Sequence, residues 1–555
     1  MTATGFTAGR ERYYRRDIAL GDGARGVEPT VSSAVPGVPP GVWHGQAARA
    51  LGLSGIVSDA QMKALFGLGM HPDAKVLVAR ELEQGASLKR AMRAAKLGPA
   101  VPRLTELSPL DREIQEVLDQ VSEQLCRPLT KAETRAVRQR TAAHAFTAEY
   151  HRAPADGAEL GRFVAARTGP QRRAITGYDL TFSCEELSLL FALAGPQVRR
   201  TVLEVLSQAR SETVAWLEQH ALAVRTGPGG VAQQQAEPGL LGTVYLHYES
   251  RAGDVMLHEH VVISPRVQGP DGRWRNLDSR LLLREVVAAS ELFNQRALEL
   301  ICDRLGLATE EVEVTPGQRP VMRIVGIDRR IRAAFAQRAD AVRSMSQTLF
   351  DDYRRRHGRQ PQRPARIRLQ WQATVMTRPP KRAARSLDEL LAAWRRRAIA
   401  VTDRQVVDNL LATAQAAAQN RPASPAFDLT SAAGQVLAAV AERRTTFRRR
   451  HVLAEARRYL MRTLAGATAP PQAAELITDQ VLAHGDCLDI TPPEITPPHP
   501  DLQRPDGTSI YRPIGSATYT THSLLAAENR LLAAARTSVI PPVGRSTFAR
   551  VAALH

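Results

Sequence analysis

Three histidines in the middle of the chain have the residue type and spacing of a metal site. His258 and His260 lie two residues apart in VMLHEHVVI, a run rich in β-branched residues that predicts a strand. Side chains alternate in direction along a strand, so both imidazoles face the same way. His247 lies in GTVYLHYES, and a short turn at ESRAGD would return that strand beside the second one. Three nitrogen ligands leave coordination positions open, as in catalytic divalent-metal sites. The alternative is an exposed polar strand end at HEH, with His247 an unrelated surface residue.

An acid within a neighbouring predicted strand is a second candidate. Asp179 lies in YDLTFS, where it shares one face with Thr181 and Ser183. An acid flanked by apolar residues in a strand is costly unless it has a partner. Asp179 would either hydrogen-bond a ligating histidine and fix its tautomer, or accept a proton from a nucleophile. The alternative is an acid on an edge strand that faces solvent.

Two adjacent tyrosines near the N-terminus, Tyr13 and Tyr14, lie in the arginine-rich run RERYYRR. A phenol has an unperturbed pKa near 10. Surrounding cations and a nearby metal ion favour the phenolate and therefore make it a nucleophile. The alternative is that one tyrosine belongs to the core and the other to the surface.

The elements that position these residues predict an α+β fold. Strand-like and helix-like segments over residues 1–325 indicate an antiparallel β-sheet with packed helices. Residues 326–465 predict a basic helical region, so the C-terminal part is mostly helical. Residues 466–520 contain TPPEITPPHP and predict a proline-rich linker, and residues 521–555 include the amphipathic run SLLAAENRLLAAAR.

The net charge of +18, mostly due to arginine, fits a polyanionic partner such as nucleic acid. The alternative is an arginine-rich surface that is merely solvated. None of the four cysteines forms a CxxC pair, which excludes a zinc ribbon and indicates reduced thiols. Because the chain lacks a long apolar run and an apolar N-terminal segment, we expect a cytoplasmic protein without membrane insertion.

The basic helical region also carries aromatic residues among its cations: Phe350, Tyr353, Trp371 and Trp394. Arginine contacts to phosphate and stacking of bases on rings would hold a single strand of DNA. The alternative places the aromatic residues in a helical core. The predicted DNA-binding residues are Arg251, Arg354, Arg355, Arg356, Arg366, Arg368 and Trp371.

These stretches together resemble the TrwC-like relaxase domain of MobF-type conjugative relaxases, within the wider superfamily of His-hydrophobic-His (HUH) endonucleases. The stretches that carry the resemblance span about residues 6–280 and include TAGRERYYRRDIALGD, PPGVWHGQAARALGLSG, GYDLTFS and YLHYESRAGDVMLHEHVV. Weaker similarity continues through DYRRRHGR and TRPPKRAARSLDELLAAWRRRA. The separation of the GYDLTFS and LHxH blocks is the specific feature.

The resemblance implies a palm-like relaxase core over residues 1–325 and a metal-dependent tyrosine DNA endonuclease. By that resemblance, His247, His258 and His260 hold a divalent ion, Mg²⁺ or Mn²⁺, which polarises the scissile phosphate. Tyr13 or Tyr14 attacks that phosphate and leaves a 5′-phosphotyrosine, with Asp179 assisting. The implied function is site- and strand-specific nicking of single-stranded DNA at a plasmid transfer origin for conjugation. The implied partners are that DNA, relaxosome accessory proteins, a coupling protein and a separate helicase.

The chain departs from the family pattern in four features. Ser32 and Ser33 stand where many relatives have a second tyrosine pair, and Glu185 and Glu186 replace a lysine-containing segment after TFS. The central residue of the HxH block is Glu259, which is not hydrophobic. The chain contains no GxxxxGK[ST] loop, so we expect no ATP site, and residues 521–555 resemble the segment that precedes a helicase in relatives.

Two alternative functions remain open from the sequence. One is a catalytically degenerate, relaxase-like protein that only binds DNA, which the altered segment after TFS and the missing second tyrosine pair motivate. The other is a rolling-circle replication initiator that uses the same chemistry.

Overall fold

A computed structural model of the chain describes most of its length. The described residues are 1–7, 39–99, 108–124, 129, 131–167, 175–314, 319–379, 385–421, 427–494, 499–537 and 544–553. They belong to two compact units. Of the described residues, the larger unit takes in 1–4, 39–59 and those from 178 onward, and the smaller one takes in 5–7 and those from 60 to 177.

A five-stranded sheet forms the centre of the fold. Its strands, in spatial order, are β1 (Thr2–Thr7), β3 (Ile175–Ser183), β7 (Val255–Ile263), β6 (Gly242–Glu249) and β2 (Val42–His44). β7 is central and pairs antiparallel with both β3 and β6, while β2 pairs antiparallel with β6. The predicted antiparallel sheet with packed helices is confirmed, including the predicted strand at GYDLTFS and the β6–β7 hairpin closed at ESRAGD.

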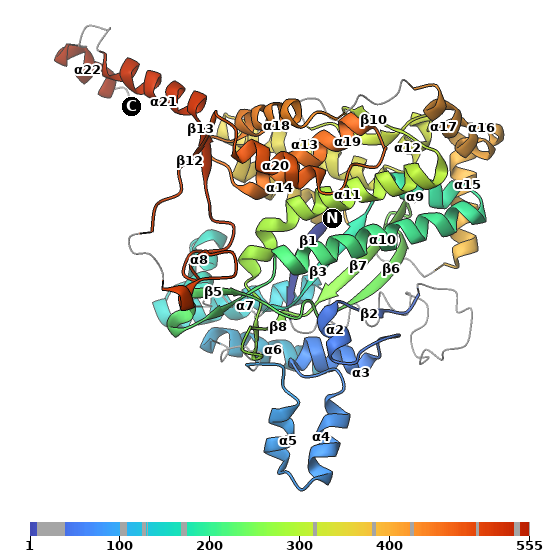
Figure 1. Cartoon of the computed structure of the whole chain (residues 1–555). Coiled ribbons are helices and arrows are strands. Elements are labelled where there is room, and N and C mark those ends of the chain that lie inside the picture. The colour runs from blue at the N-terminus through green and yellow to red at the C-terminus, as the bar shows by residue number, and fades with distance from the viewer. Residues whose placement is uncertain are drawn as a thin grey trace. The chain divides into compact units, whose positions relative to one another are not determined.

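Three helices cover one face of this sheet. α9 (Glu185–Leu193) packs on β7, and the long helices α10 (Pro196–His220) and α11 (Ser279–Leu305) lie side by side across it (Figure 1). The alternate residues of the strands point into this layer, and Phe182 of β3 meets Phe293 of α11 edge-on with ring centroids 5.2 Å apart. Each fully buried side chain of this kind contributes about 1.5–3 kcal/mol to stability.

One charged residue of β7 also points into the helical layer. Glu259 accepts a hydrogen bond from Nε of Arg210 on α10 at 2.9 Å, and the two side chains are only 9% and 7% exposed. Arg210 also donates to Oγ of Ser207 at 2.8 Å. Its Nη1 lies 3.1 Å from Nδ1 of His44, whose pKa falls to about 3 because of burial and the charge of Arg210. His44 is therefore neutral and acts as an acceptor.

Two small antiparallel sheets adjoin the central layer, β4 (Ala223–Thr226) with β5 (Ala232–Gln235) and β8 (Arg266–Gln268) with β9 (Trp274–Asn276). β7 ends at Ile263, and β8 begins three residues later. The turn at Asp271 and Gly272 joins β8 to β9.

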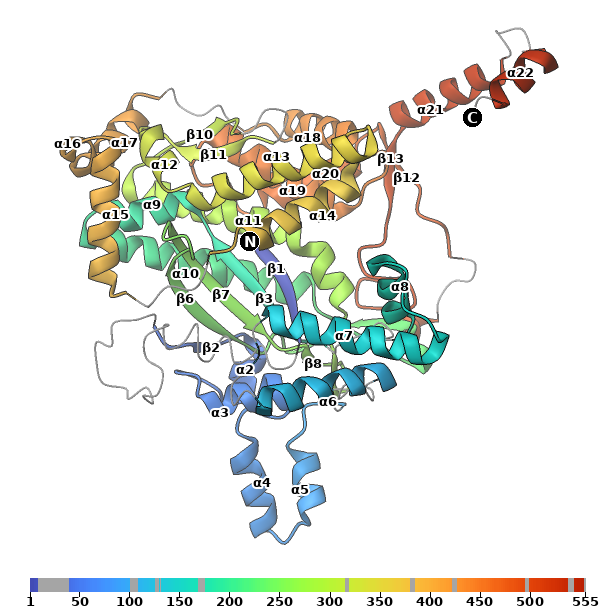
Figure 2. The ribbon, with the colours of Figure 1, turned by 180° about the vertical axis from the view of Figure 1, so that it is seen from behind.

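The predicted helical character of the chain after residue 325 is confirmed. A short hairpin, β10 (Thr309–Val312) with β11 (Val321–Ile324), precedes the helices. The helices α13 (Gln337–His357) and α14 (Arg363–Met376) pack against each other, as the view from behind shows (Figure 2). The helices are α12 (Arg329–Ala334), α13 (Gln337–His357), α14 (Arg363–Met376), α15 (Leu387–Val401), α16 (Arg404–Asp408) and α17 (Leu410–Gln419).

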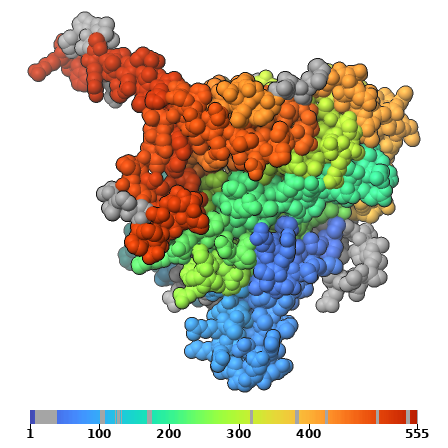
Figure 3. Space-filling view, viewed as in Figure 1, coloured from blue at the N-terminus to red at the C-terminus, as the bar shows by residue number. Residues whose placement is uncertain are grey.

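A second hydrophobic core lies among α18 (Leu429–Arg443), α19 (Arg449–Leu464) and α20 (Ala473–Leu482). In the space-filling view these helices form one continuous orange mass beside the green α10 and α11 (Figure 3). The segment 466–520, expected to be a proline-rich linker, thus contains a helix whose Ile477 and Val481 are fully buried. The boundaries of the four predicted domains stay a prediction.

The remaining C-terminal elements are small. β12 (Cys487–Asp489) pairs with β13 (Tyr519–Thr521), and the helices α21 (His522–Arg536) and α22 (Arg545–Ala552) follow with no buried residue. None of the helices in the described part of the chain combines the length and the apolar character needed to cross a membrane.

The smaller unit is helical. α6 (Pro109–Gln124), α7 (Lys131–Tyr150) and α8 (Gly157–Arg167) share a core in which Phe146 and Phe163 meet edge-on with centroids 5.2 Å apart. α4 (Ala74–Glu83) and α5 (Leu88–Ala94) form a separate helical pair.

The buried Arg210–Glu259 pair gives a testable prediction. Glu259→Leu leaves the Arg210 charge buried without its carboxylate, and we expect it to lower the free energy of unfolding by about 3–5 kcal/mol. Urea unfolding followed by circular dichroism measures this. The double variant Arg210→Met/Glu259→Leu should regain most of that loss. Asp340→Asn, which breaks the exposed pair with Arg343, serves as the control and should change stability by less than about 1 kcal/mol. Equal effects for Glu259→Leu and Asp340→Asn would contradict the prediction.

Candidate metal centre and its surroundings

The strand register brings the three predicted histidines together. His247 of β6 lies directly opposite His258 of β7, and His260 follows two residues along the same face. The ring centroids are 4.9–5.3 Å apart for the three pairs. Their ligand nitrogens all lie within 4.8 Å of one another, close enough for one cation. This face is opposite to the one on which Glu259 meets Arg210.

Hydrogen bonds fix the tautomers of two of these rings. Nδ1 of His258 lies 2.7 Å from the carbonyl oxygen of Met256, which can only accept, so Nδ1 carries the proton. Nδ1 of His260 lies 2.9 Å from both carboxylate oxygens of Asp179 and donates to them in the same way. Each Nε2 is then left as an unprotonated lone pair, the form that binds a metal ion.

The electrostatic environment also keeps His258 neutral. Burial, followed by the neighbouring His260, lowers the pKa of His258 to about 4. A ligating imidazole must be deprotonated, and at neutral pH His258 meets that requirement without competition from protons. Three nitrogen donors backed by one carboxylate are a donor set that fits a first-row divalent cation.

Asp179 contacts a candidate ligand. It lies on β3, an internal strand of the sheet, and its side chain is 13% exposed. Thr181 Oγ1, on the same face, is 3.3 Å from Nδ1 of His260 and 3.4 Å from the Asp179 carboxylate. These contacts fix the orientation of the His260 ring.

A glycine of the PPGVW block lies against the same face of the sheet. Gly41 approaches the ring of Tyr245, the residue directly opposite His260 on β6, so closely that an added Cβ would overlap the ring. The block therefore needs glycine at this point so that β2 can lie beside β6 without displacing Tyr245.

The turn of the β6–β7 hairpin is anchored by helices that sequence reasoning did not connect with it. The buried Asp254 accepts hydrogen bonds from the backbone N–H of Arg338, in the first turn of α13, and from Arg397 of α15, both at 2.9 Å. Trp394 Nε1 donates to the carbonyl of Gly253 at 3.1 Å. Trp394, one of the aromatic residues considered for DNA contact, is 1% exposed and is therefore a packing residue. Arg251, predicted to bind DNA, is a half-buried residue of this turn.

The two acids after TFS have structural partners. Glu186 is buried in the first turn of α9 and accepts hydrogen bonds from the backbone of Ile324 at 2.9 Å and from Nη2 of Arg332 at 2.8 Å. Glu185 forms an ion pair with Arg323. Acids are favourable at a helix N-terminus, and here they tie α9 to β11 and α12.

The predicted DNA-binding residues of α13 and α14 lie on the surface. Arg354 and Arg355 pair with Asp351 and Asp352 of their own helix, and Arg356 is exposed. On α14, Arg366 stacks over the ring of Phe350, with 5.3 Å between the guanidinium carbon and the ring centroid.

An exposed apolar stripe runs along α14. Trp371 is 70% exposed, and Ile367 and Val375, one turn before and after it, are 56% and 53% exposed. Arg366 and Arg368 flank this stripe. The helix thus presents a ring and guanidinium groups side by side, the combination that single-stranded nucleic acids bind.

The predicted nucleophiles Tyr13 and Tyr14 lie outside the described residues, as do Ser32 and Ser33. Strand β1 ends at Thr7, six residues before Tyr13, and β1 is the neighbour of β3 in the sheet.

Comparisons with known proteins point to one family. The family model of the TrwC relaxase matches residues 8–401. The metal-bound complex of conjugative relaxase TrwC with OriT DNA is 17% identical, over 72% of this chain and 96% of its own, with a TM-score of 0.42. The metal-free complex of TrwC with OriT DNA is also 17% identical, over 72% of this chain and 96% of its own, with a TM-score of 0.40. TrwC complexed with a 27-mer DNA comprising the recognition hairpin and the cleavage site is 16% identical. This match covers 72% of this chain and 98% of the TrwC chain, with a TM-score of 0.39. Among curated proteins no match was found.

The metal centre predicts a graded loss of cation binding. His258→Ala removes one of three nitrogen donors and should abolish measurable binding of Mn²⁺ in a calorimetric titration. Asp179→Asn keeps the donors but weakens the hold on the His260 ring, and it should lower affinity about 10- to 100-fold. His144→Ala changes a side chain that is 80% exposed and should bind as the unmodified protein does. Unchanged Mn²⁺ affinity in His258→Ala would refute the three-histidine site.

Proposed function

Because the chain belongs to the TrwC relaxase family, we propose that it nicks single-stranded DNA at a plasmid transfer origin, with a tyrosine nucleophile and a divalent cation, for conjugative transfer. The observation that carries this proposal is the convergence of His247, His258 and His260 on one face of the sheet, with Asp179 behind His260. All four residues lie within the matched residues 8–401.

The three histidines would hold the cation, with Mg²⁺ or Mn²⁺ as the proposed ion. When bound, such a cation polarises the scissile phosphate and neutralises the charge that develops on it. The protein contributes the fixed orientation of the donors. The Met256 carbonyl and the Asp179 carboxylate hold the Nδ1 protons of His258 and His260, so both Nε2 atoms carry a lone pair.

Asp179 is better suited to orienting the His260 ring than to accepting a proton from the nucleophile. Its two oxygens both lie 2.9 Å from Nδ1 of His260, so the carboxylate is already engaged as an acceptor. This supports the first of the two roles that the sequence left open for Asp179.

The proposed nucleophile is Tyr13 or Tyr14. The tyrosine oxygen forms a bond to phosphorus while the bond from phosphorus to the 3′-oxygen breaks. The phenol loses its proton, the released 3′-oxygen gains one, and the 5′ end stays bound to the protein as a phosphotyrosine. This covalent bond conserves the energy of the phosphodiester for later rejoining.

The α13–α14 surface is the proposed path of the DNA strand. Trp371 offers a stacking platform, while Arg356, Arg366 and Arg368 supply cations for phosphates. Relaxosome accessory proteins, a coupling protein and a separate helicase are further proposed partners.

The structure weakens one argument for a degenerate protein that only binds DNA. The replacement of the lysine-containing segment by Glu185 and Glu186 motivated that alternative. Both acids have partners on β11 and α12, which supports a structural reason for the replacement.

A covalent-adduct assay tests the proposed chemistry. The full chain is incubated with Mn²⁺ and a library of labelled single-stranded oligonucleotides drawn from candidate transfer origins, and adducts are separated on a denaturing gel. We expect an adduct that disappears in the Phe variant of the true nucleophile, Tyr13→Phe or Tyr14→Phe, while binding of the DNA is retained. Cleavage that persists in the double variant would exclude both tyrosines, and no adduct with any oligonucleotide would exclude the enzymatic function.

The stacking role of Trp371 is tested separately. Trp371→Ala should weaken binding of a labelled single strand by about 1–3 kcal/mol, because one base loses its stacking partner, whereas Trp371→Phe should keep most of the affinity. Fluorescence anisotropy measures both. Leu531→Ala on α21, also an exposed apolar side chain at 71%, is the control and should bind as the unmodified protein does. A Trp371→Ala affinity equal to that of the control would place the DNA elsewhere.

A further inference from the structure

Two adjoining pockets lie where α11 meets α18 and α19, and they differ in how their charges are balanced. The larger, of about 540 Å³, lies between these helices and the β10–β11 hairpin. The smaller, of about 90 Å³, shares four lining residues with it. The shared residues are Arg319, Arg443, Glu455 and Arg458.

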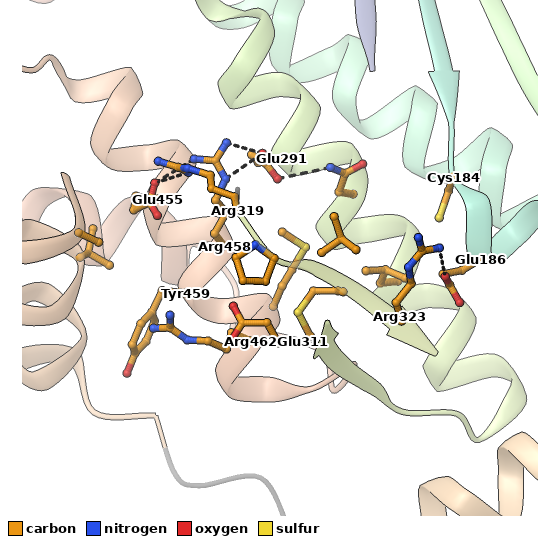
Figure 4. Close-up of a pocket in the computed structure, with 18 of the residues that line it drawn as sticks. Cys184, Glu186, Glu291, Glu311, Arg319, Arg323, Glu455, Arg458, Tyr459 and Arg462 are labelled. Carbon is orange, nitrogen blue, oxygen red and sulfur yellow. Dashed lines mark hydrogen bonds and ion pairs between the residues drawn. The ribbon is translucent and has the colours of Figure 1, made fainter. Parts of the chain in front are cut away.

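Most arginines of the larger pocket are paired with carboxylates (Figure 4). Arg458 binds Glu291 and Glu455, and Arg319 also binds Glu455, with a nitrogen–oxygen distance of 2.6 Å. On the other side of the pocket, Arg323 reaches Glu186 at 3.3 Å. This pocket largely neutralises itself and offers little to an ionic ligand.

The smaller pocket, by contrast, has an excess of positive charge. Among the described residues, six arginines and one acid, Glu455, line it, and that acid is already bound by Arg319 and Arg458. The other four arginines have no carboxylate within 4.0 Å among the residues that the structure describes. These four are Arg284 of α11, Arg443 of α18, Arg444, which follows α18, and Arg450 of α19.

Three of these four arginines are exposed, so the pocket is open to solvent. Arg284, Arg443 and Arg444 are exposed, and Arg450 is half-buried. The carboxylate of Glu285 interacts through space with Arg450 and Arg284. Arg450 itself contacts the carbonyl of Gly515 at 3.4 Å.

The N-terminus of α19 adds to the positive potential of the smaller pocket. The first turn of this sixteen-residue helix contains no acid, and His451 lies within it. Nδ1 of His451 accepts a hydrogen bond from the backbone N–H of Arg448 at 3.2 Å, so the ring presents its Nε2–H as a donor. Burial and the charges of Arg444 and Arg450 lower the pKa of His451 to about 4. The cations at this helix N-terminus repel one another, and they are also unfavourable next to the positive end of the helix dipole. A bound anion relieves both effects.

We infer that the small pocket formed by Arg284, Arg443, Arg444, Arg450 and His451 is a second DNA-binding site, which holds a backbone phosphate of the strand away from the metal centre. Arginine forks bind phosphate oxygens in pairs, and a pocket of this size suits a single phosphate group. Its exposed side allows a polymer to enter and leave. Arg284 of α11 lies within the family-matched residues 8–401, whereas the other four residues of the site lie beyond them, on or next to α18 and α19.

The choice of DNA as the source of the phosphate rests on the proposed function. Contacts to a backbone phosphate carry no sequence information. The site therefore serves any strand that passes, and it would hold DNA while the metal centre acts on one specific bond.

Binding of oligothymidine, which contains no origin sequence, tests the site in the full chain. The variant Arg284→Gln/Arg443→Gln/Arg444→Gln changes only exposed side chains, so folding is preserved, and thermal melting verifies this. The matched control, Arg530→Gln/Arg536→Gln/Arg545→Gln, removes the same charge from exposed positions of α21 and α22. Anisotropy over a series of salt concentrations gives the affinity and its salt dependence.

We expect the pocket variant to bind oligothymidine roughly tenfold more weakly than the control. Its slope of log affinity against log salt should fall by about 0.7 for each DNA phosphate that the variant no longer binds. A variant with lysine at the same three positions should recover part of the affinity, because the charge is restored. Equal affinities and slopes for the pocket variant and the matched control would overturn the inference.

Two further measurements separate the possible failures. Calorimetry with inorganic phosphate that gives binding to the pocket, combined with unchanged oligothymidine binding in the variant, would assign the pocket to a free phosphate and overturn its role in DNA binding. The covalent-adduct assay is independent of this site. Absence of any adduct with the unmodified chain refutes the nicking function, whereas a pocket variant that forms adducts but binds oligothymidine as the control does refutes only the second site.

Discussion

The fold of the candidate site depends on the register of one strand, β7. Its pairing with β6 places His247 opposite His258, and its pairing with β3 brings Asp179 to His260. A shift of β7 by one residue would turn both of its histidines into the helical layer and Glu259 out of it, because side chains alternate along a strand. The alternation thus separates a face for the metal from a face for the core.

The buried charges on the reverse face make that register costly to change. Glu259 finds its partner Arg210 only when it points toward α10, and Arg210 in turn is hydrogen-bonded to Ser207 and His44. A slipped strand would leave Arg210 buried without its counter-charge. The polar residue between the two ligating histidines is therefore explained by packing beneath the site and not by contact with a metal ion.

The helices after residue 325 connect the site to the rest of the chain. Asp254 and Gly253, in and beside the β6–β7 turn, bind α13 and α15, and the same α13 packs against α14, which carries Trp371. The surface proposed for the DNA strand is thereby attached directly to the hairpin that holds His247 and His258. Further along the chain, α18 and α19 add arginines that have no carboxylate within 4.0 Å among the described residues.

The sequence by itself determined the strand pattern, the spacing of the three histidines and the family resemblance, because pleat and turn are local properties of the chain. It also indicated the α+β core followed by basic helices. Only the tertiary structure decided the partners of Arg210, Asp254 and Glu186, because those contacts join residues that are 49 or more positions apart. It likewise buried Trp394, left Trp371 exposed and placed α20 in a core. Burial and ion pairing depend on which elements meet, and no local pattern in the sequence encodes that choice.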